Sequence, residues 1–287
     1  MKYQPSEIIS SRSNKTIKYL KSLSLSRNRQ KESRFIVDGI RIIEEILEQG
    51  RSVKKLIISP LAAENERAAM IVEAAREQGI EVVWVAERVV DYLAETKTSQ
   101  GVLALVEPQE FSEDDLLKGQ MPMIVVAHLL QDPGNLGTIV RVTEAAGAGG
   151  VVTTPGTVDF YNPKALRATM GSIFRLPALR TQSLEAFVDR FKSRGYQTVA
   201  AMVSAKTRYF DIDYTKPTIL LLGQEGAGLT PEAGQLADYK VSIPMVTMID
   251  SLNVASAASI ILYEAVRQNL SPGVLPENNL NRRSFLV

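Results

Sequence analysis

Between residues 34 and 106, short apolar runs alternate with longer stretches in which apolar residues recur every three or four positions. Short runs are typical of buried β-strands, and the longer spacing is typical of amphipathic helices. Glycines close several of the helical stretches and support their boundaries. The pattern predicts a small α/β/α domain with strands at 34–38, 53–59, 80–85 and 102–106 and helices at 40–48, 61–78 and 87–95.

A second alternating series begins at Met123, after an acidic, proline-bearing segment from Glu107 to Pro122 in which we place a linker. This series predicts a parallel sheet with helices on both faces and ligands at the carboxyl ends of the strands. Its strands are expected near 123–127, 150–153, 175–179, 197–203, 218–222 and 240–243. Its helices are expected near 136–147, 163–170, 184–194, 231–237 and 252–269.

Ahead of both series, residues 10–32 place Ile17, Leu20, Leu23 and Leu25 among basic side chains, which predicts a short basic amphipathic helix. We therefore expect an α/β protein with two domains and flanking segments. The expected divisions are a basic N-terminal arm at 1–30, a first domain at 31–107, a linker at 108–121, a second domain at 122–270 and a tail at 271–287.

The stretch Ile243–Ile261 runs from the end of a predicted strand through a polar loop into the last predicted helix. Small residues fill the first turns of that helix, so its backbone can approach another group closely. Ser251 and Asn253 occupy capping positions, from which their side chains can also face a ligand. A plain capped core helix explains the same pattern, so the functional interpretation depends on the other motifs.

Composition narrows the possible chemistry. The chain has 287 residues, 45% of them apolar and 23% charged, and no apolar run long enough to span a membrane. It contains no cysteine, which excludes a thiolate nucleophile, and its one histidine, His128, excludes a metal site with two histidines in one chain. We expect a cytoplasmic protein whose chemistry needs neither a thiol nor zinc or another metal.

Charge is distributed unevenly. Residues 1–34 hold nine Lys or Arg and two Glu, whereas the rest of the chain has a net charge of −6. A basic segment on a mildly acidic body favours an anionic partner, most simply a nucleic acid. A solubilising tail is the alternative.

Two further junctions between strand and helix stand out. In Leu130–Arg141, Pro-Gly-Asn makes a turn, Asn135 can cap the next helix, and Arg141 falls on the first turns of that helix. In Leu220–Leu229, glycines allow a ligand to approach the backbone, and Glu225 lies in the turn. The glycine spacing matches no phosphate-binding loop or dinucleotide fingerprint. Ordinary turns with surface charges remain the alternative at both junctions.

Taken together, the three junctions resemble the SpoU/TrmH-type RNA 2′-O-ribose methyltransferases of the SPOUT superfamily. The matching segments are 132–141, 223–229 and 243–245 with 251–254, within a resemblance that covers about 120–270. Residues 30–106 look more loosely like the ribosomal-protein-L30e-like domain often fused ahead of it. Thr247, where glycine is usual, and Ala255-Ser256, where Ser-Val is common, depart from the family pattern.

The resemblance implies S-adenosylmethionine (AdoMet) as cofactor, a deep trefoil knot, and a homodimer formed through the second domain with its active site at the interface. It also assigns residues. The implied cofactor contacts are Met202, Leu222, Gly223, Ile243, Ser251 and Leu252. The implied catalytic residues are Asn135, Arg141, Glu225, Ser251 and Asn253, with Asn135 and Glu225 orienting Arg141. The expected RNA contacts are Arg12, Lys15, Lys18, Arg34, Asn162 and Arg167.

The implied chemistry suits the composition, because the substrate's own ribose hydroxyl is the nucleophile and the protein needs none. The resemblance makes Arg141 the suspected base, yet an arginine normally stays protonated and can instead bind the phosphate beside the attacked ribose. The sequence leaves both roles open. His128 is interpreted as an ordinary residue at a strand end.

The sequence thus predicts an AdoMet-dependent RNA 2′-O-ribose methyltransferase, with ribosomal RNA, most simply 23S, preferred over tRNA because an L30e-like domain suits a folded RNA. A non-catalytic RNA-binding or assembly factor with the same fold is the opposing alternative. A dinucleotide-dependent dehydrogenase would need a glycine fingerprint that the sequence lacks.

Overall fold

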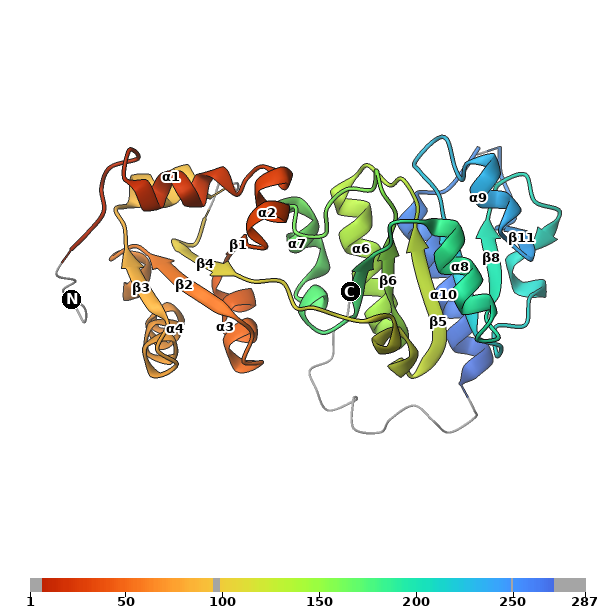
Figure 1. Cartoon of the computed structure of the whole chain (residues 1–287), viewed down its shortest axis with the longest axis horizontal. Helices are drawn as coiled ribbons and strands as arrows, with labels where there is room; N and C mark the ends of the chain where they lie inside the picture. The colour runs from red at the N-terminus through yellow and green to blue at the C-terminus, as the bar shows by residue number, and fades with distance from the viewer. Residues whose placement is uncertain (1–6, 95–98, 249, 271–287) are drawn as a thin grey trace.

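The computed structural model describes residues 7–94, 99–248 and 250–270, so the tail predicted at 271–287 lies outside the described residues. The elements gather around two separate sheets (Figure 1). We call the elements from α1 to β4 the first unit and those from β5 to α10 the second unit. The division of the chain at particular boundary residues remains a prediction.

The first unit is a mixed sheet between two layers of helices. Its strand order is β1-β4-β2-β3, in which β2 and β3 are parallel and the other pairs are antiparallel. The strands are β1 Phe35–Asp38, β2 Val53–Ile58, β3 Glu81–Trp84 and β4 Val102–Val106. The helices are α1 Lys15–Ser22, α2 Ser26–Glu32, α3 Ile40–Glu48, the 3-10 helix η1 Ala62–Glu64, α4 Glu66–Glu77 and α5 Glu87–Leu93.

The basic N-terminal segment forms part of this unit's core. Ile17, Leu20 and Leu23 are buried in one apolar cluster with residues of β2, β3, β4 and α5. The single helix predicted over 10–32 is instead two helices, because the backbone becomes extended at Leu25. The basic side chains of α1 therefore project from a packed helix.

The second unit is a sheet of order β7-β6-β5-β10-β8-β11-β9, and the pairings among its described strands are parallel. The strands are β5 Met121–Ala127, β6 Ala148–Thr153, β7 Ala178–Arg180, β8 Gln197–Ala201, β9 Thr207–Arg208, β10 Thr218–Leu222 and β11 Tyr239–Ser242. The helices are α6 Pro133–Ala145, α7 Pro163–Thr169, α8 Leu184–Lys192, α9 Pro231–Gln235 and α10 Val254–Asn269. The 3-10 helices η3 Ser172–Phe174 and η4 Tyr209–Asp211 also belong to it, and η2 Glu113–Lys118 lies between the two units in the chain.

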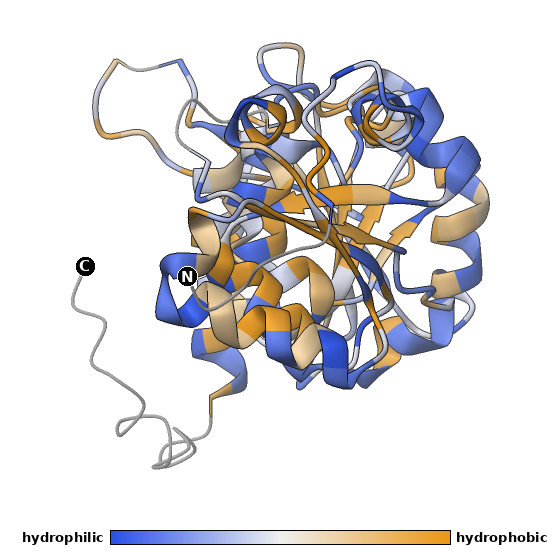
Figure 2. Ribbon diagram, turned by 90° about the vertical axis from the view of Figure 1, so that its left-hand side faces the viewer, coloured by the Kyte–Doolittle hydropathy of each residue, from blue (hydrophilic) through white to orange (hydrophobic). Residues whose placement is uncertain are grey.

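Helices cover both faces of this sheet, which confirms the predicted α/β class. Apolar residues of α6, α7 and α10 share one cluster with the sheet, and those of α8 and α9 share another on the opposite face. Seen from the side of the first unit, apolar strands lie between helices whose outer surfaces are largely hydrophilic (Figure 2). Among the helices described, none is long and apolar enough to cross a membrane.

Two local differences from the predicted pattern have clear causes. Helix α6 begins at Pro133, three residues earlier than predicted, because Asp132 caps it through the Asn135 N–H and a proline suits the first helical position. The predicted linker contains η2, whose Leu116 is buried against the second sheet. The linker is thus packed against the second unit.

The buried face of α1 gives a test of this packing. We expect Leu20→Ala to lower the free energy of unfolding by about 2–5 kcal/mol, because it leaves a cavity in the core of the first unit. Lys18→Ala on the exposed face of the same helix should change it by less than about 0.5 kcal/mol. Equal effects in urea unfolding would contradict the described packing.

Candidate active site

The predicted cofactor residues surround one cavity at the carboxyl ends of β8, β10 and β11. It has a volume of about 600 Å³, a size typical of cofactor sites. Met202, Leu222, Gly223, Ile243, Ser251 and Leu252 all line it, together with Glu225 and Asn253. The structure therefore brings the junctions at 220–229 and 243–261 together around a single space.

A folded-back glycine loop forms much of the cavity wall. Gln224 and Gly228 exchange backbone hydrogen bonds of 2.9 and 2.8 Å, which close the loop after β10. A Cβ added at Gly223 would lie 2.2 Å from the carbonyl carbon of Gly228, so this position requires glycine. The loop thus presents backbone to the cavity, as the glycine spacing led us to expect.

A chain of side-chain hydrogen bonds links the three junctions. Asn135 Nδ2 donates to Glu225 Oε1 at 2.8 Å, and Asn253 Nδ2 donates to Asn135 Oδ1 at 2.9 Å. Asn253 Oδ1 in turn accepts from the N–H groups of Ala255 and Ser256, which caps α10. We call Glu225, Asn135 and Asn253 the relay. It fixes the starts of α6 and α10 to the glycine loop.

Glu225 is the most fully bonded group of the relay. Its carboxylate also accepts the backbone N–H groups of Gln131 at 3.1 Å and Asp132 at 3.3 Å. Burial opposes its ionisation, but the hydrogen bonds from Asn135, Gln131 and Asp132 outweigh burial and lower the pKa of Glu225 below its ordinary value. Glu225 is therefore an ionised anchor for the loop between β5 and α6.

Arg141 lies outside the relay. It is exposed on α6, about two turns beyond Asn135, and within the described part of the chain its guanidinium has no hydrogen-bond or ion-pair partner. We expected Asn135 and Glu225 to orient it, but their polar atoms bond to each other, to Asn253 and to backbone instead. The guanidinium is free to meet a substrate.

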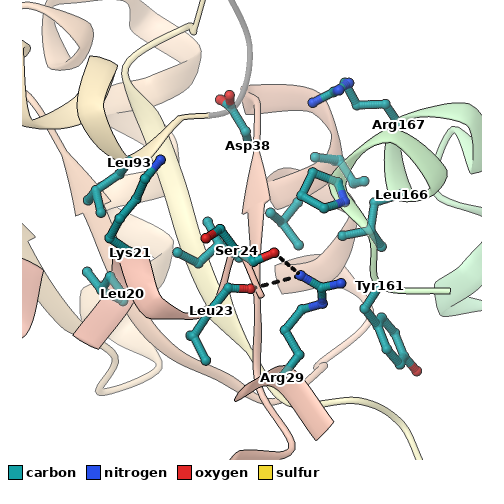
Figure 3. Close-up of a pocket in the computed structure, with 14 residues that line it drawn as sticks. Leu20, Lys21, Leu23, Ser24, Arg29, Asp38, Leu93, Tyr161, Leu166 and Arg167 are labelled. Carbon is teal, nitrogen blue, oxygen red and sulfur yellow. Dashed lines mark hydrogen bonds between the residues drawn. The ribbon is translucent and has the colours of Figure 1, made fainter. Parts of the chain in front are cut away.

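The expected RNA residues lie apart from the cavity. Lys15 and Lys18 are exposed on α1, and the guanidinium of Arg12 lies 4.9 Å from the centre of the Tyr92 ring. Arg167 is exposed on α7 and lines a groove between the two units, across from Lys21 (Figure 3).

Two of the expected RNA residues, Arg34 and Asn162, also make contacts that stabilise the fold. Arg34 donates to Tyr19 Oη at 3.4 Å and to Glu107 at 3.3 Å, and these contacts raise its pKa against the effect of burial. Asn162 caps α7 by accepting the Lys164 N–H at 2.9 Å. Both remain near the junction of the two units.

Sequence reasoning missed Gln131, which supports the loop between β5 and α6. Its side-chain amide donates to the carbonyls of Leu129 and Gly156, both at 2.8 Å. Leu129 in this loop has φ +59°, a backbone conformation that leucine rarely adopts. The sequence therefore gives no signal for the shape of the loop. The small residues Ala201, Val203 and Ser204 also line the cavity, and the sequence gives them no distinctive signal.

His128 takes no part in the cavity. Its Nδ1 lies 3.0 Å from Thr154 Oγ1, and burial lowers its pKa. Across the described ranges, no cluster of three or more His, Asp or Glu residues could hold a metal ion.

Two family models match the chain. The model described as the SpoU rRNA Methylase family matches residues 122–263, and the one described as the MRM3-like substrate binding domain matches residues 14–104. The first match contains the whole cavity and relay, and the second begins at the N-terminal cap of α1.

Similar proteins cover nearly the same length. The 23S rRNA (guanosine(2553)-2'-O)-methyltransferase RlmP of Bacillus subtilis is 31% identical over 89% of this chain and 97% of that protein. A 23S rRNA (uridine(2479)-2'-O)-methyltransferase of Streptomyces viridochromogenes is 32% identical over 86% and 88%. The AdoMet-bound rRNA methyltransferase structure from Sinorhizobium meliloti has a TM-score of 0.82 and 31% identity, over 92% of this chain and 99% of that chain.

The lowered pKa of Glu225 predicts a pH-dependent contribution to stability. Because the folded-state pKa lies below the ordinary value of 4.5, the ionised carboxylate stabilises the fold above that value. The contribution is lost as the pH falls through the folded-state pKa. We expect Glu225→Gln to lower the free energy of unfolding by about 1–3 kcal/mol at pH 7. The substitution replaces one of the two carboxylate oxygens that accept backbone N–H groups with an NH2 group, which cannot accept a hydrogen bond. Urea unfolding should show this deficit shrinking below about pH 4; a constant deficit would contradict the assignment.

Proposed function

The chain belongs to the SpoU rRNA methylase family, and on that premise we propose that it methylates a ribose 2′-hydroxyl of ribosomal RNA, most simply 23S. It is an AdoMet-dependent RNA 2′-O-ribose methyltransferase. The observation that carries methyl transfer is the arrangement of the second unit, in which a glycine-walled cavity adjoins the relay. The choice of 23S rRNA is supported by the two 23S rRNA methyltransferases to which this chain is similar.

The cavity fits AdoMet in size and in the character of its walls. We assign Met202, Leu222, Gly223, Ile243, Ser251 and Leu252 as its contacts, because they line the cavity together. When bound there, AdoMet supplies a methyl group on a sulfonium sulfur, so the protein needs no nucleophile of its own. Because Gly223 packs closely against Gly228 and has no side chain, this part of the wall can contact AdoMet through backbone groups.

The protein's own part in the reaction is to align the ribose hydroxyl and to assist its deprotonation. We assign Ser251 and Asn253 to the substrate side, because both are exposed at the start of α10 on the cavity rim. Asn135 and Glu225 hold Asn253 in place through the relay. We infer that Arg141 binds the phosphate next to the reacting ribose, since it is exposed and unpaired among the described residues and an arginine keeps its proton.

Cationic side chains of both units supply the proposed RNA contacts. Arg12, Lys15 and Lys18 project from α1 and the segment before it, and Arg167 faces Lys21 across the groove between the units (Figure 3). Cations on both units suit an RNA that crosses the junction. Arg34 and Asn162 complete this proposed contact surface.

A homodimer through the second unit completes the proposed site. Val246 and Met248 are fully exposed in the loop before α10, and Tyr263 on α10 is 52% exposed. Exposed apolar residues beside a binding cavity favour a covering partner. The trefoil knot and a cytoplasmic location are part of the same proposal, which the family resemblance and the absence of cysteine support.

Arg141→Ala tests the mechanism. We expect methyl transfer to 23S rRNA to fall at least about a hundredfold, because the substrate phosphate loses its partner, while AdoMet affinity stays within about twofold. Lys216→Ala, just before β10 and so at the opposite end of that strand from the cavity, is the matched control and should retain full activity. Undiminished methylation by Arg141→Ala would remove this residue from the mechanism.

Lys15→Gln with Lys18→Gln tests the proposed RNA contacts on α1. Both side chains are exposed, so the double variant should fold normally yet bind RNA more weakly. The slope of log affinity against log salt should become shallower by about 1–2. Glu87→Gln on the same unit is a surface control expected to leave the slope unchanged. An unaltered slope in the double variant would show that these lysines make no phosphate contact.

A further inference from the structure

One apolar cluster continues across the junction between the two units. Phe35 on β1 stacks on Tyr161 of the second unit with ring centres 4.2 Å apart, and it lies 6.2 Å from the ring of Phe174. Val37 and Leu166 belong to the same buried cluster. A shared buried core favours a fixed arrangement over free movement of two domains.

Arg29 connects the two units at one end of this core. Its side chain is only 5% exposed, although it lies in the segment richest in exposed positive charge. The guanidinium donates to Asp159 Oδ2 at 2.8 Å. It also donates to the carbonyls of Leu23 and Ser24 at 2.9 and 2.8 Å (Figure 3). It therefore links the end of α1 and helix α2 to the second unit.

Asp159 is itself fixed by its surroundings. Its Oδ1 accepts the Tyr161 N–H at 3.0 Å, and Ser26 Oγ donates to Oδ2 at 3.3 Å. A buried guanidinium needs such a partner, because removing one member of a buried pair leaves an uncompensated charge. The ion pair can therefore form only when α2 and the loop before α7 are held in this relative position.

A second set of contacts holds the other end of the junction. Arg175 of the second unit pairs with Glu45 on α3 and with Glu144 on α6. Arg51 of the first unit donates to the carbonyl of Phe174. The two ends together resist rotation about the apolar cluster as well as separation from it.

The segment between the units is also anchored. Glu107 pairs with Arg34 and with Lys54, and Leu116 of η2 is buried against the second sheet. This segment is therefore held at both ends by contacts with the two units.

We propose that Arg29 and Asp159 are positioning residues that hold the first unit at a fixed orientation to the methyl-transfer site. The groove beside them carries Lys21 from one unit and Arg167 from the other. When an RNA binds both cations, the only nucleotide that can reach the methyl-transfer site is one that lies at a fixed distance from these contacts. This inference rests on the proposed function, and it makes the ion pair a determinant of how the RNA is placed in the site.

The test compares Asp159→Asn with Asp189→Asn, an exposed acidic residue on α8. Because the chain has no cysteine, spin labels can be placed on Met70→Cys of α4 and Glu185→Cys of α8, both exposed, with excess unlabelled chain added. Electron spin resonance then gives the distance distribution between the two units. In parallel, kcat and KM for 23S rRNA and the Kd for AdoMet are measured.

We expect Asp159→Asn to broaden the distance distribution and to lower kcat/KM for RNA about ten- to a hundredfold, mainly through KM, since misplacement of a substrate by about an ångström is costly. The Kd for AdoMet should stay within about twofold, and Asp189→Asn should match the wild type. A narrow distribution in Asp159→Asn, or a broad one with unchanged RNA kinetics, would overturn the proposal.

Two additional measurements keep the outcomes separate. If Asp159→Asn fails to fold, Arg29→Lys keeps the positive charge but lacks the donors for Asp159 and both carbonyls together. It should give the same broadening, and a narrow distribution there would overturn the proposal. If the wild type methylates no RNA, the proposed function fails, and the distance distributions still show whether the ion pair holds the units together.

Discussion

The site depends on the hydrogen bonds that join Glu225, Asn135 and Asn253. Each residue belongs to a different junction, and these junctions are separated by about ninety and by 118 positions in sequence. The sheet brings β5 and β10 together as neighbours, which places the loops after them side by side. The relay then fixes the start of α6 and the start of α10 against the glycine loop. Without the relay, the position of the cavity wall and the positions of the proposed substrate-binding groups would not be fixed relative to each other.

A division of labour follows from this constraint. Buried and backbone groups define the cavity, as at Gly223, where even a methyl group would collide with Gly228. Charged groups that are exposed and unpaired within the described residues, such as Arg141, remain available to RNA. Arg29 differs from Arg141, because this cation of the basic segment is buried and pairs with Asp159 of the second unit. Local charge alone therefore does not identify the RNA contacts.

Much of the architecture could be predicted from the apolar pattern, because each strand and helix has its own spacing. The strand order could not, since alternating elements do not specify that β10 lies between β5 and β8. Asn135, Glu225 and Asn253 were named through a family resemblance, and their mutual bonds needed the fold. Leu129 was not predicted because its left-handed backbone is held by hydrogen bonds with side chains: its N–H donates to Thr157 Oγ1, and its carbonyl accepts from Gln131 Nε2. The burial of Arg29 likewise depends on Asp159, 130 positions away.

The most direct measurement is transfer of tritiated methyl groups from AdoMet to separated 16S rRNA, 23S rRNA and bulk tRNA, followed by nuclease digestion to nucleosides. We predict label in 23S rRNA, recovered as a 2′-O-methylnucleoside. Label confined to tRNA would contradict the ribosomal substrate, and label on a base would contradict the ribose chemistry. No transfer to any RNA, together with no binding of AdoMet, would contradict the proposed enzyme altogether.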